Sequence, residues 1–325
     1  MTRAAIQATT GFRCKAEFVF FPSEDKRWSM WFLLGLTSAL MNSTSDLFLK
    51  LANRPRAESP PRLVDAALSG CLMHAGMTLI TLPVACLLDP LPDISLETLW
   101  PVLVSSGIGL ASAPLYVSAM RDAPLSLTAP LMAITPVCLL ATGPLIVGDD
   151  FRLAGVGGVL ICAAGIYTSN LESDKPWHWP LLNLWHNKGQ LKMVAATVLF
   201  SISSPIDRLG VERMGTSWYI ASLTLMIALG LAPVAMVGLL RGSAKPNLRS
   251  LAVSSIAATA SAGSQFMAVT LAPVAYVICL KRLSTVIGPL FGRWFLDEPI
   301  GGRRVLGSWI IFVGTVLIAL TSLIE

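Results

Sequence analysis

The chain has 325 residues, of which 54% are hydrophobic and only 13% are charged, whereas a typical soluble domain has about 25% charged residues. Its mean hydropathy is +0.67, and several windows of about 20 residues, the length that a helix needs to cross a bilayer, hold few or no charges. These values exclude an ordinary soluble protein and predict an all-α, polytopic membrane protein. The net charge of +5 does not indicate nucleic-acid binding, because most lysines and arginines lie between the apolar segments, where they influence topology and meet lipid headgroups.

The cysteines and histidines show no pattern typical of a metal site or a redox motif. The six cysteines lie singly, mostly inside apolar windows, and no CxxC pair occurs, which favours small apolar residues within helices. The three histidines, His74, His178 and His186, have no metal-ligand spacing. We therefore expect no metal and no cofactor.

Ten spanning segments follow an N-terminal tail, residues 1–28. They cover residues 29–51, 64–88, 98–120, 123–148, 153–171, 191–212, 217–240, 249–271, 273–296 and 302–323. The tail lacks a continuous apolar core with a cleavage site, so a secretory signal is not expected. It is either a cytosolic tail or sequence upstream of a start at Met30. The connection 172–190 divides the ten segments into two groups of five, and its tryptophans suit the headgroup layer.

The two halves of the chain resemble each other. Residues 119–168 align with residues 268–317 without a gap, at a constant offset of 149. The alignment matches Pro124 with Pro273, Gly143 with Gly292, Asp149 with Glu298, Gly158 with Gly307 and Gly165 with Gly314. We interpret this as a duplication, with one five-helix repeat at 29–171 and a second at 191–325. A duplicated unit with an odd number of helices inserts in the opposite orientation, which predicts the inverted-repeat architecture of secondary transporters, with a substrate site near the midplane.

Polar residues inside the first and second segments are candidate site residues, because a charge at the centre of a spanning helix costs about 2.5–3.5 kcal/mol. Asn42, Asp46 and Lys50 follow one another at spacings of four and share one helix face. Asp46 is expected to pair with Lys50, either within a site or at the interface to which Lys50 extends. His74 is expected to form an interhelical hydrogen bond, and a ligand or proton-relay role is the alternative.

The sixth and eighth segments carry further polar residues. Ser203, Ser204 and Asp207 lie deep in the sixth segment, where Pro205 frees a backbone carbonyl and is expected to break the helix beside the carboxylate. Arg208 points about 100° away from Asp207 on a helix and is expected at the interface. In the eighth segment, Gln265 is expected to serve helix packing, with a ligand role as the alternative, as for His74.

Two adjacent cations, Lys281 and Arg282, lie in the ninth segment, eight and nine residues after Pro273. If they formed a loop, only about 14 residues would remain before Asp297, too few to cross a bilayer. We therefore place both cations inside the ninth helix.

The duplication shows that these cations belong to one half only. The matching positions of the first half hold Met132 and Ala133, so the charge is not part of the shared scaffold. Three interpretations stay open: the cations bind an anion, they pair with Asp46 or Asp207, or they extend to the interface.

The stretch "APVAYV…KRLSTVIGPLFGRWFLDEP", its copy "APLSLTAPLMAITPV…GDD" and the ten segments in two halves resemble EamA-type permeases of the drug/metabolite transporter superfamily, over about residues 29–325. The resemblance implies a ten-helix inverted-repeat transporter with a central cavity and cytoplasmic termini. The distribution of lysine and arginine over the loops favours outward-facing termini instead.

Lys281 and Arg282 are also similar to the phosphate-binding pair of the sugar-phosphate and nucleotide-sugar branch of that superfamily, which implies an anion-binding role for them. The lysine that this branch has in its fourth helix is absent here. An amino acid or a carboxylate is therefore as good a candidate as a phosphorylated substrate.

We predict a secondary transporter, and not an enzyme, that moves a small anionic or zwitterionic metabolite across a cell membrane, plasma or inner, by alternating access. The candidate substrate ligands are Lys281, Arg282, Asn42, Ser203, Ser204 and Ser284, and the candidates for ion coupling or charge pairing are Asp46, Asp207, His74 and Lys50. The alternatives are an exporter of hydrophobic cations, an integral-membrane enzyme and a non-transporting scaffold. The expected partners are a small-molecule substrate and membrane lipid, without nucleic acid, and both a monomer and a homodimer stay open.

Overall fold

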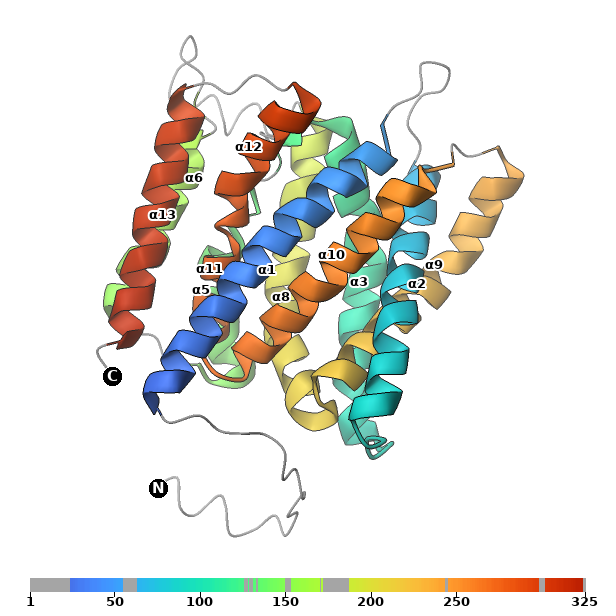
Figure 1. Ribbon diagram of the computed structural model, residues 1–325, viewed down its shortest axis with the longest axis horizontal. Coiled ribbons are helices and arrows are strands. Elements are labelled where there is room, and N and C mark those ends of the chain that lie inside the picture. Colours follow the sequence, from blue (N-terminus) through green and yellow to red (C-terminus); the bar gives the residue numbers. More distant parts are fainter. Residues whose placement is uncertain are drawn as a thin grey trace.

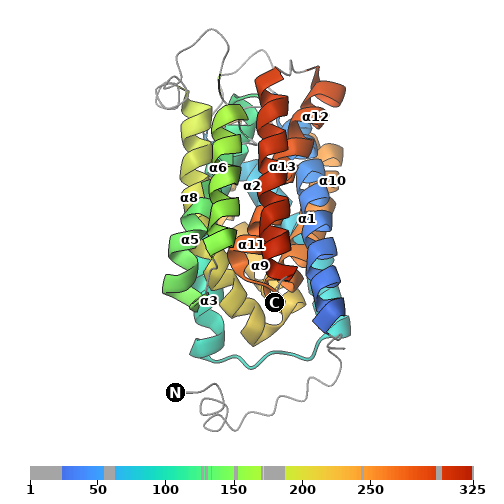
Figure 2. The same cartoon turned by 90° about the vertical axis from the view of Figure 1, so that its left-hand side faces the viewer.

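The computed structural model describes residues 24–54, 63–125, 128, 131–132, 134–149, 153–169, 171, 187–242, 245–297 and 302–323, and every regular element in these ranges is a helix. The helices are α1 (Glu24–Ala52), α2 (Leu63–Leu88), α3 (Leu96–Asp122), α5 (Ile134–Val147), α6 (Leu153–Ser169), α8 (Lys188–Met214), α9 (Thr216–Leu240), α10 (Leu248–Val269), α11 (Val274–Lys281), α12 (Ser284–Leu296) and α13 (Gly302–Leu323). They stand side by side in one bundle (Figure 1). Seen from the side, α6 and α13 form one face of it (Figure 2).

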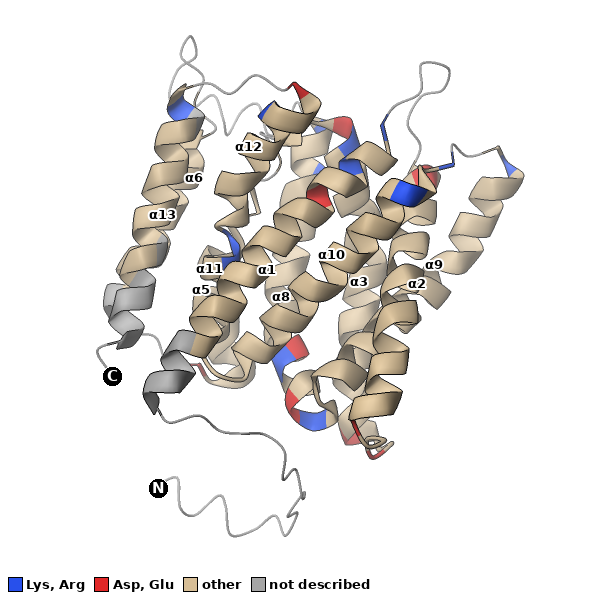
Figure 3. Cartoon of the chain, viewed as in Figure 1, with Lys and Arg blue, Asp and Glu red and all other residues tan. Residues whose placement is uncertain are grey.

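Five helical segments of the described chain are long and apolar enough to cross a membrane. They are Leu63–Leu88, Leu96–Asp122, Lys188–Met214, Thr216–Leu240 and Val274–Leu296, of which the last joins α11 and α12. Shorter apolar helices cover Ile134–Val147, Gly155–Ser169 and Val305–Gly314. Charged positions gather at the two ends of the bundle, and its middle is almost free of them (Figure 3). Large apolar side chains such as Leu79, Leu87 and Trp309 are exposed, as expected for a surface that faces lipid.

The ends of most helices agree with the expected segments, although α5 begins at Ile134, within the expected segment 123–148. Helix α8 begins at Lys188, within the expected connection, because the side chain of Asn187 accepts hydrogen bonds from the backbone N–H groups of Gly189 (3.0 Å) and Gln190 (3.2 Å) and so caps the helix. Helix α1 begins at Glu24, five residues before the expected start. Residues 172–186, with the tryptophans of the connection, lie outside the described residues, as does Glu298.

Pro205 does not break the sixth spanning helix, so that expectation is wrong. Helix α8 runs without interruption from Lys188 to Met214. Proline has no N–H to offer the carbonyl four residues earlier, which here belongs to Ser201. Thr142 of α5 donates its hydroxyl to this carbonyl oxygen at 2.8 Å. A neighbouring helix therefore satisfies the group that Pro205 leaves free, and the helix continues.

Helices from the two halves of the chain pack in pairs: α1 with α10, α2 with α9, α3 with α8, and α6 with α13. Glycines allow α6 and α13 to approach closely. A Cβ atom at Gly165 would lie 2.8 Å from the carbonyl oxygen of Gly307, and one at Gly314 would lie 2.7 Å from that of Gly158. Small residues at an interface let membrane helices pack backbone against backbone.

Candidate functional site

A cavity of about 230 Å³ lies in the bundle, between helices of the first half and helices of the second. Eight of the ten candidate residues line it, namely Asn42, Asp46, His74, Ser203, Ser204, Asp207, Lys281 and Arg282. The other two do not. Lys50 lies at the end of α1, and its Nζ donates to the carbonyl oxygen of Ala123 at 2.7 Å. Ser284 is buried at the start of α12, where its carbonyl oxygen accepts a hydrogen bond from Ser43 (3.2 Å).

The ninth spanning segment is interrupted at the two cations. Lys281 is the last residue of α11, and α12 begins at Ser284, so the cations lie inside the span, as expected, but at a break in the helix. The carbonyl oxygen of Arg282 accepts hydrogen bonds from both the backbone N–H (2.8 Å) and the hydroxyl (2.7 Å) of Thr285. The interruption is confined to Arg282 and Leu283, whose backbone angles stay in the right-handed helical region.

Lys281 is held by an amide and not by a carboxylate. Its Nζ donates to Oε1 of Gln265, on α10, at 2.6 Å. Gln265 thus fixes the ammonium group at the cavity wall, a role beyond helix packing. Among the described residues, neither Lys281 nor Arg282 forms an ion pair with Asp46 or Asp207.

Arg282 reaches across to the first half of the chain. Its terminal nitrogens donate to the hydroxyl of Thr135 (3.0 Å) and approach the sulfur of Met132 (3.8 Å). The residue is only 4% exposed, and its Nε has no hydrogen-bond partner. A buried guanidinium that forms no ion pair is costly, and an anion in the cavity would lower that cost.

Asp46 is bound by neutral donors. Nδ2 of Asn42 donates to it at 2.9 Å, and the hydroxyl of Tyr116, on α3, donates to its other oxygen. The expected pairing with Lys50 is not formed, because the lysine side chain extends to the helix end and binds Ala123. Asn42 and Asp46 share one helix face, as the spacing of four indicates.

Asp207 has a similar environment in the second half. The buried hydroxyl of Tyr219, on α9, donates to it at 2.7 Å, and the ring of Tyr219 packs edge-on against Phe266. The sequence analysis did not identify either tyrosine as a site residue. A feature of the sequence could have identified them: Tyr116 and Tyr219 are two of only four tyrosines, and both lie inside apolar segments, where a hydroxyl needs a hydrogen-bond partner.

The remaining polar candidates on α2 and α8 bond within their own helices. Nδ1 of His74 lies 2.8 Å from the carbonyl oxygen of Gly70, one turn earlier, so the expected interhelical bond is not the one observed. The hydroxyls of Ser203 (3.5 Å) and Ser204 (2.7 Å) both donate to the carbonyl oxygen of Phe200.

Asp149 joins the two halves near the start of α11. One of its oxygens pairs with Arg208 of α8 at 2.6 Å, and the other accepts a hydrogen bond from the backbone N–H of Val274 at 3.1 Å. A carboxylate is favourable at a helix N-terminus, where backbone N–H groups are free. Arg208 also pairs with Glu212 (2.9 Å). The acidic residue that closes the fourth spanning segment therefore stabilises the broken ninth segment.

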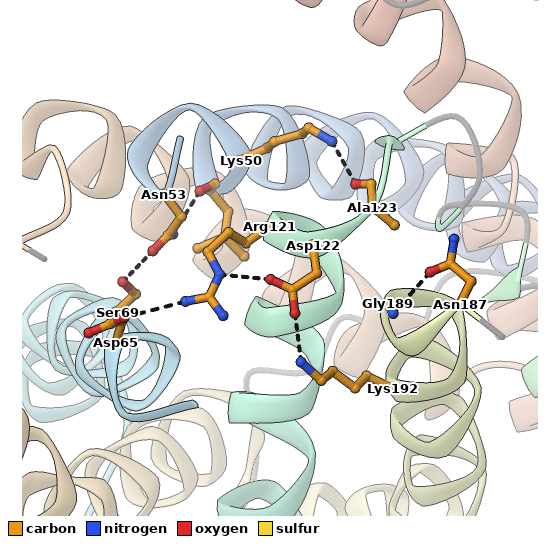
Figure 4. Close-up of polar contacts among 11 residues, drawn as sticks. Lys50, Asn53, Asp65, Ser69, Arg121, Asp122, Ala123, Asn187, Gly189 and Lys192 are labelled. Carbon is orange, nitrogen blue, oxygen red and sulfur yellow. Dashed lines mark hydrogen bonds and ion pairs between the residues drawn. The ribbon is translucent and has the colours of Figure 1, made fainter. Parts of the chain in front are cut away.

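A polar cluster lies at one end of the bundle and joins α1, α2, α3 and α8 (Figure 4). Asp122 pairs with both Arg121 (2.9 Å) and Lys192 (2.6 Å), and Arg121 also lies 3.8 Å from Asp65. In the same view, Lys50 extends toward Ala123. These contacts hold together the ends of helices whose middle parts line the cavity.

The fold and the cavity define a class: a helical integral membrane protein with a charged internal cavity between its two halves. Residues 187–320 match the EamA-like transporter family. That family is part of the drug/metabolite transporter superfamily, so the match confirms, over these residues, the resemblance seen in the sequence. The matched residues cover α8 to α11, α12 and most of α13.

Solved structures extend the comparison to both halves. One chain, described as "Crystal structure of protein", is similar over 90% of this chain and 97% of its own, with a TM-score of 0.60 and 20% sequence identity. At this identity the likeness shows the fold alone. A comparison with curated proteins finds no match.

Proposed function

We propose that the protein is a secondary transporter that moves a small anionic or zwitterionic metabolite across a membrane by alternating access. One observation carries the proposal: Lys281 and Arg282 line the cavity at a helix break, and in the described chain neither has a carboxylate partner. Cations that line an internal cavity without forming an ion pair favour an anionic ligand.

The architecture that we propose is a pair of inverted five-helix repeats, and glycine packing supports it. In the alignment of the two halves, Gly158 matches Gly307 and Gly165 matches Gly314. The observed contacts are Gly158 with Gly314 and Gly165 with Gly307, so each contact is the image of the other under the duplication. The pairs α1–α10 and α8–α3 are related in the same way. Such reciprocity is expected of two repeats related by a two-fold axis in the membrane plane.

The charges of the cavity favour a zwitterion over a simple anion. Asp46 and Asp207 line the same cavity as Lys281 and Arg282, so the wall offers both signs of charge. A volume of about 230 Å³ lies below the range of about 300–1,000 Å³ typical of pockets for drug-sized ligands. We therefore favour a small metabolite with a carboxylate at Lys281 and an amino group at one of the aspartates. The other aspartate is then available for a coupling proton.

Export of hydrophobic cations is the second candidate. The observation that favours it is that Asp46 and Asp207 bind tyrosine and asparagine side chains and form no ion pair among the described residues. A cationic substrate would neutralise these carboxylates. Transport would then depend on Asp46 or Asp207 and would not depend on Lys281.

A thermal-shift screen of the purified protein against amino acids, carboxylates, sugar phosphates, nucleotides and hydrophobic cations tests the proposal, followed by uptake into proteoliposomes. We expect an anionic or zwitterionic compound to raise Tm and to be taken up, and Lys281→Gln to abolish both effects. Lys245→Gln, in an exposed loop, is the matched control and should behave as wild type. Stabilisation by hydrophobic cations alone, retained in Lys281→Gln, would overturn the proposal in favour of the second candidate.

A further inference from the structure

The guanidinium of Arg282 connects the break between α11 and α12 with the start of α5, about 150 residues earlier in the chain. Arg282 itself lies in the break between α11 and α12. Its two contacts, Thr135 and Met132, lie at the start of α5. One side chain of the second half therefore reaches directly to the beginning of a helix in the first half.

The two regions that Arg282 connects have the same local structure. At the start of α5, the carbonyl oxygen of Met132 accepts hydrogen bonds from the backbone N–H (3.1 Å) and the hydroxyl (2.7 Å) of Thr135. At the start of α12, the carbonyl oxygen of Arg282 accepts the same two bonds from Thr285. Met132 is one residue from Ala133, which the gapless alignment matches with Arg282. The two sites therefore lie at matching places in the two halves to within one residue.

Arginine suits this position for a geometric reason. Its guanidinium is planar and carries several donors in a rigid fork, so it can hold two partners at once, whereas the ammonium of lysine is a single flexible point. Here the two terminal nitrogens face Thr135 and Met132, and only Nε is left without a partner. Lys281, one residue earlier, donates a hydrogen bond to Gln265 within the second half. The two cations thus differ in what they contact.

We propose that Arg282 is a positioning residue that joins the two halves at their corresponding helix starts, while Lys281 is the cation that meets the substrate. Only the role of Lys281 rests on the proposed function. The contact of Arg282 with Thr135 and Met132 belongs to the folded chain and does not depend on what the protein transports. When one half moves against the other, the contact of Arg282 with Thr135 must either move with both halves or be lost. While this contact is formed, Arg282 holds the interruption between α11 and α12 in its place beside the cavity.

A double-mutant cycle on the substrate-free protein tests the contact of Arg282 with Thr135. Arg282→Lys and Thr135→Val each remove the contact between the two side chains, and we expect each to lower Tm. Combined, they should lower Tm by little more than the larger single effect, because residues in direct contact are not independent. Thr135→Ser keeps the hydroxyl and should restore the wild-type value.

Thr142→Val is the matched control. Thr142 lies on the same helix, α5, but its hydroxyl donates to Ser201 (2.8 Å), so its effect should add to that of Arg282→Lys. Additive effects of Thr135→Val and Arg282→Lys would overturn the proposal. If Arg282→Lys does not fold, amide hydrogen exchange of Thr135→Val alone tests the proposal. Faster exchange at residues 280–287 as well as at residues 131–137 would support the contact between the two halves. A change confined to residues 131–137 would overturn it.

The substrate role of Lys281 is measured separately, with sodium acetate as the probe and sodium chloride as the control. We expect acetate to raise the Tm of the wild type and of Thr135→Val, and not that of Lys281→Gln. Absence of an acetate effect in the wild type would count against the proposed function, whereas the mutant cycle would still decide on the contact of Arg282 with Thr135.

Discussion

Ser38 of α1 and Ser261 of α10 hydrogen-bond each other in both directions: each hydroxyl donates to the other residue's carbonyl oxygen, at 2.9 and 3.0 Å. Ser45 and Ser254 repeat the arrangement two turns along the same interface, at 3.1 and 3.0 Å. Such contacts require the two backbones to lie close together, and small residues permit this. The first helix of one half is thereby attached to a helix of the other half at two levels.

Removal of one of these hydroxyls should weaken the α1–α10 interface. We expect Ser38→Ala and Ser254→Ala each to lower the free energy of unfolding by about 0.6 kcal/mol, the average for hydrogen bonds between membrane helices, and by no more than about 1.7 kcal/mol. Thr44→Val is the control, because the hydroxyl of Thr44 bonds only to its own helix, at Leu40. Unfolding by denaturant in detergent measures the differences, and equal losses in all three variants would contradict the prediction.

Two glycines of α6 should respond in opposite ways to alanine. A Cβ at Gly165 would meet the backbone of α13 at 2.7–2.8 Å, whereas one at Gly157 would have no atom within 4 Å. Gly165→Ala should therefore destabilise the protein by about 1–3 kcal/mol through overpacking. Gly157→Ala should be neutral or stabilise it by up to about 1 kcal/mol, because alanine favours the helix. A Tm of Gly165→Ala at or above that of Gly157→Ala would show that α6 and α13 do not pack as described.

Tyr219→Phe should destabilise the protein through Asp207. The substitution keeps the ring that packs against Phe266 and removes only the hydroxyl that donates to the buried carboxylate. Loss of a donor to a buried charged group costs about 1–3 kcal/mol or more. In an Asp207→Asn background the same substitution should cost less, because a neutral amide loses a weaker bond. Denaturant unfolding of the four proteins measures this, and an equal cost in both backgrounds would argue against the Tyr219–Asp207 bond.

The ion pair between Asp122 and Lys192 should contribute little, and in a salt-dependent way. Both side chains lie at the end of the bundle (Figure 4) and are 16% and 28% exposed. A cycle of Asp122→Asn and Lys192→Met should give a coupling of about 0.2–1 kcal/mol. This coupling should fall in 1 M salt, where the Debye length is about 3 Å. A coupling that persists unchanged in high salt would show that the pair is shielded from solvent.

The sequence by itself determined which segments are long and apolar enough to cross a membrane and where charged residues interrupt them. Apolar length is a local property, so most helix ends were predicted closely, and the placement of Lys281 and Arg282 inside a span followed from the residues available before Asp297. The matched glycines of the two halves were also visible as a pattern, because a duplication preserves spacing. These features depend on neighbours in the sequence or on a simple comparison of one half with the other.

The tertiary structure alone decided which polar groups meet. Pro205 was expected to break its helix, but Thr142 from another helix satisfies the freed carbonyl oxygen, and the break lies beside Arg282 instead. Asp46 takes Tyr116 as a partner in place of Lys50. The physical reason is the same for Pro205, Arg282 and Asp46. In the membrane interior a polar group must find a hydrogen-bond partner within the protein. Helix packing, and not distance along the chain, decides which partner reaches it.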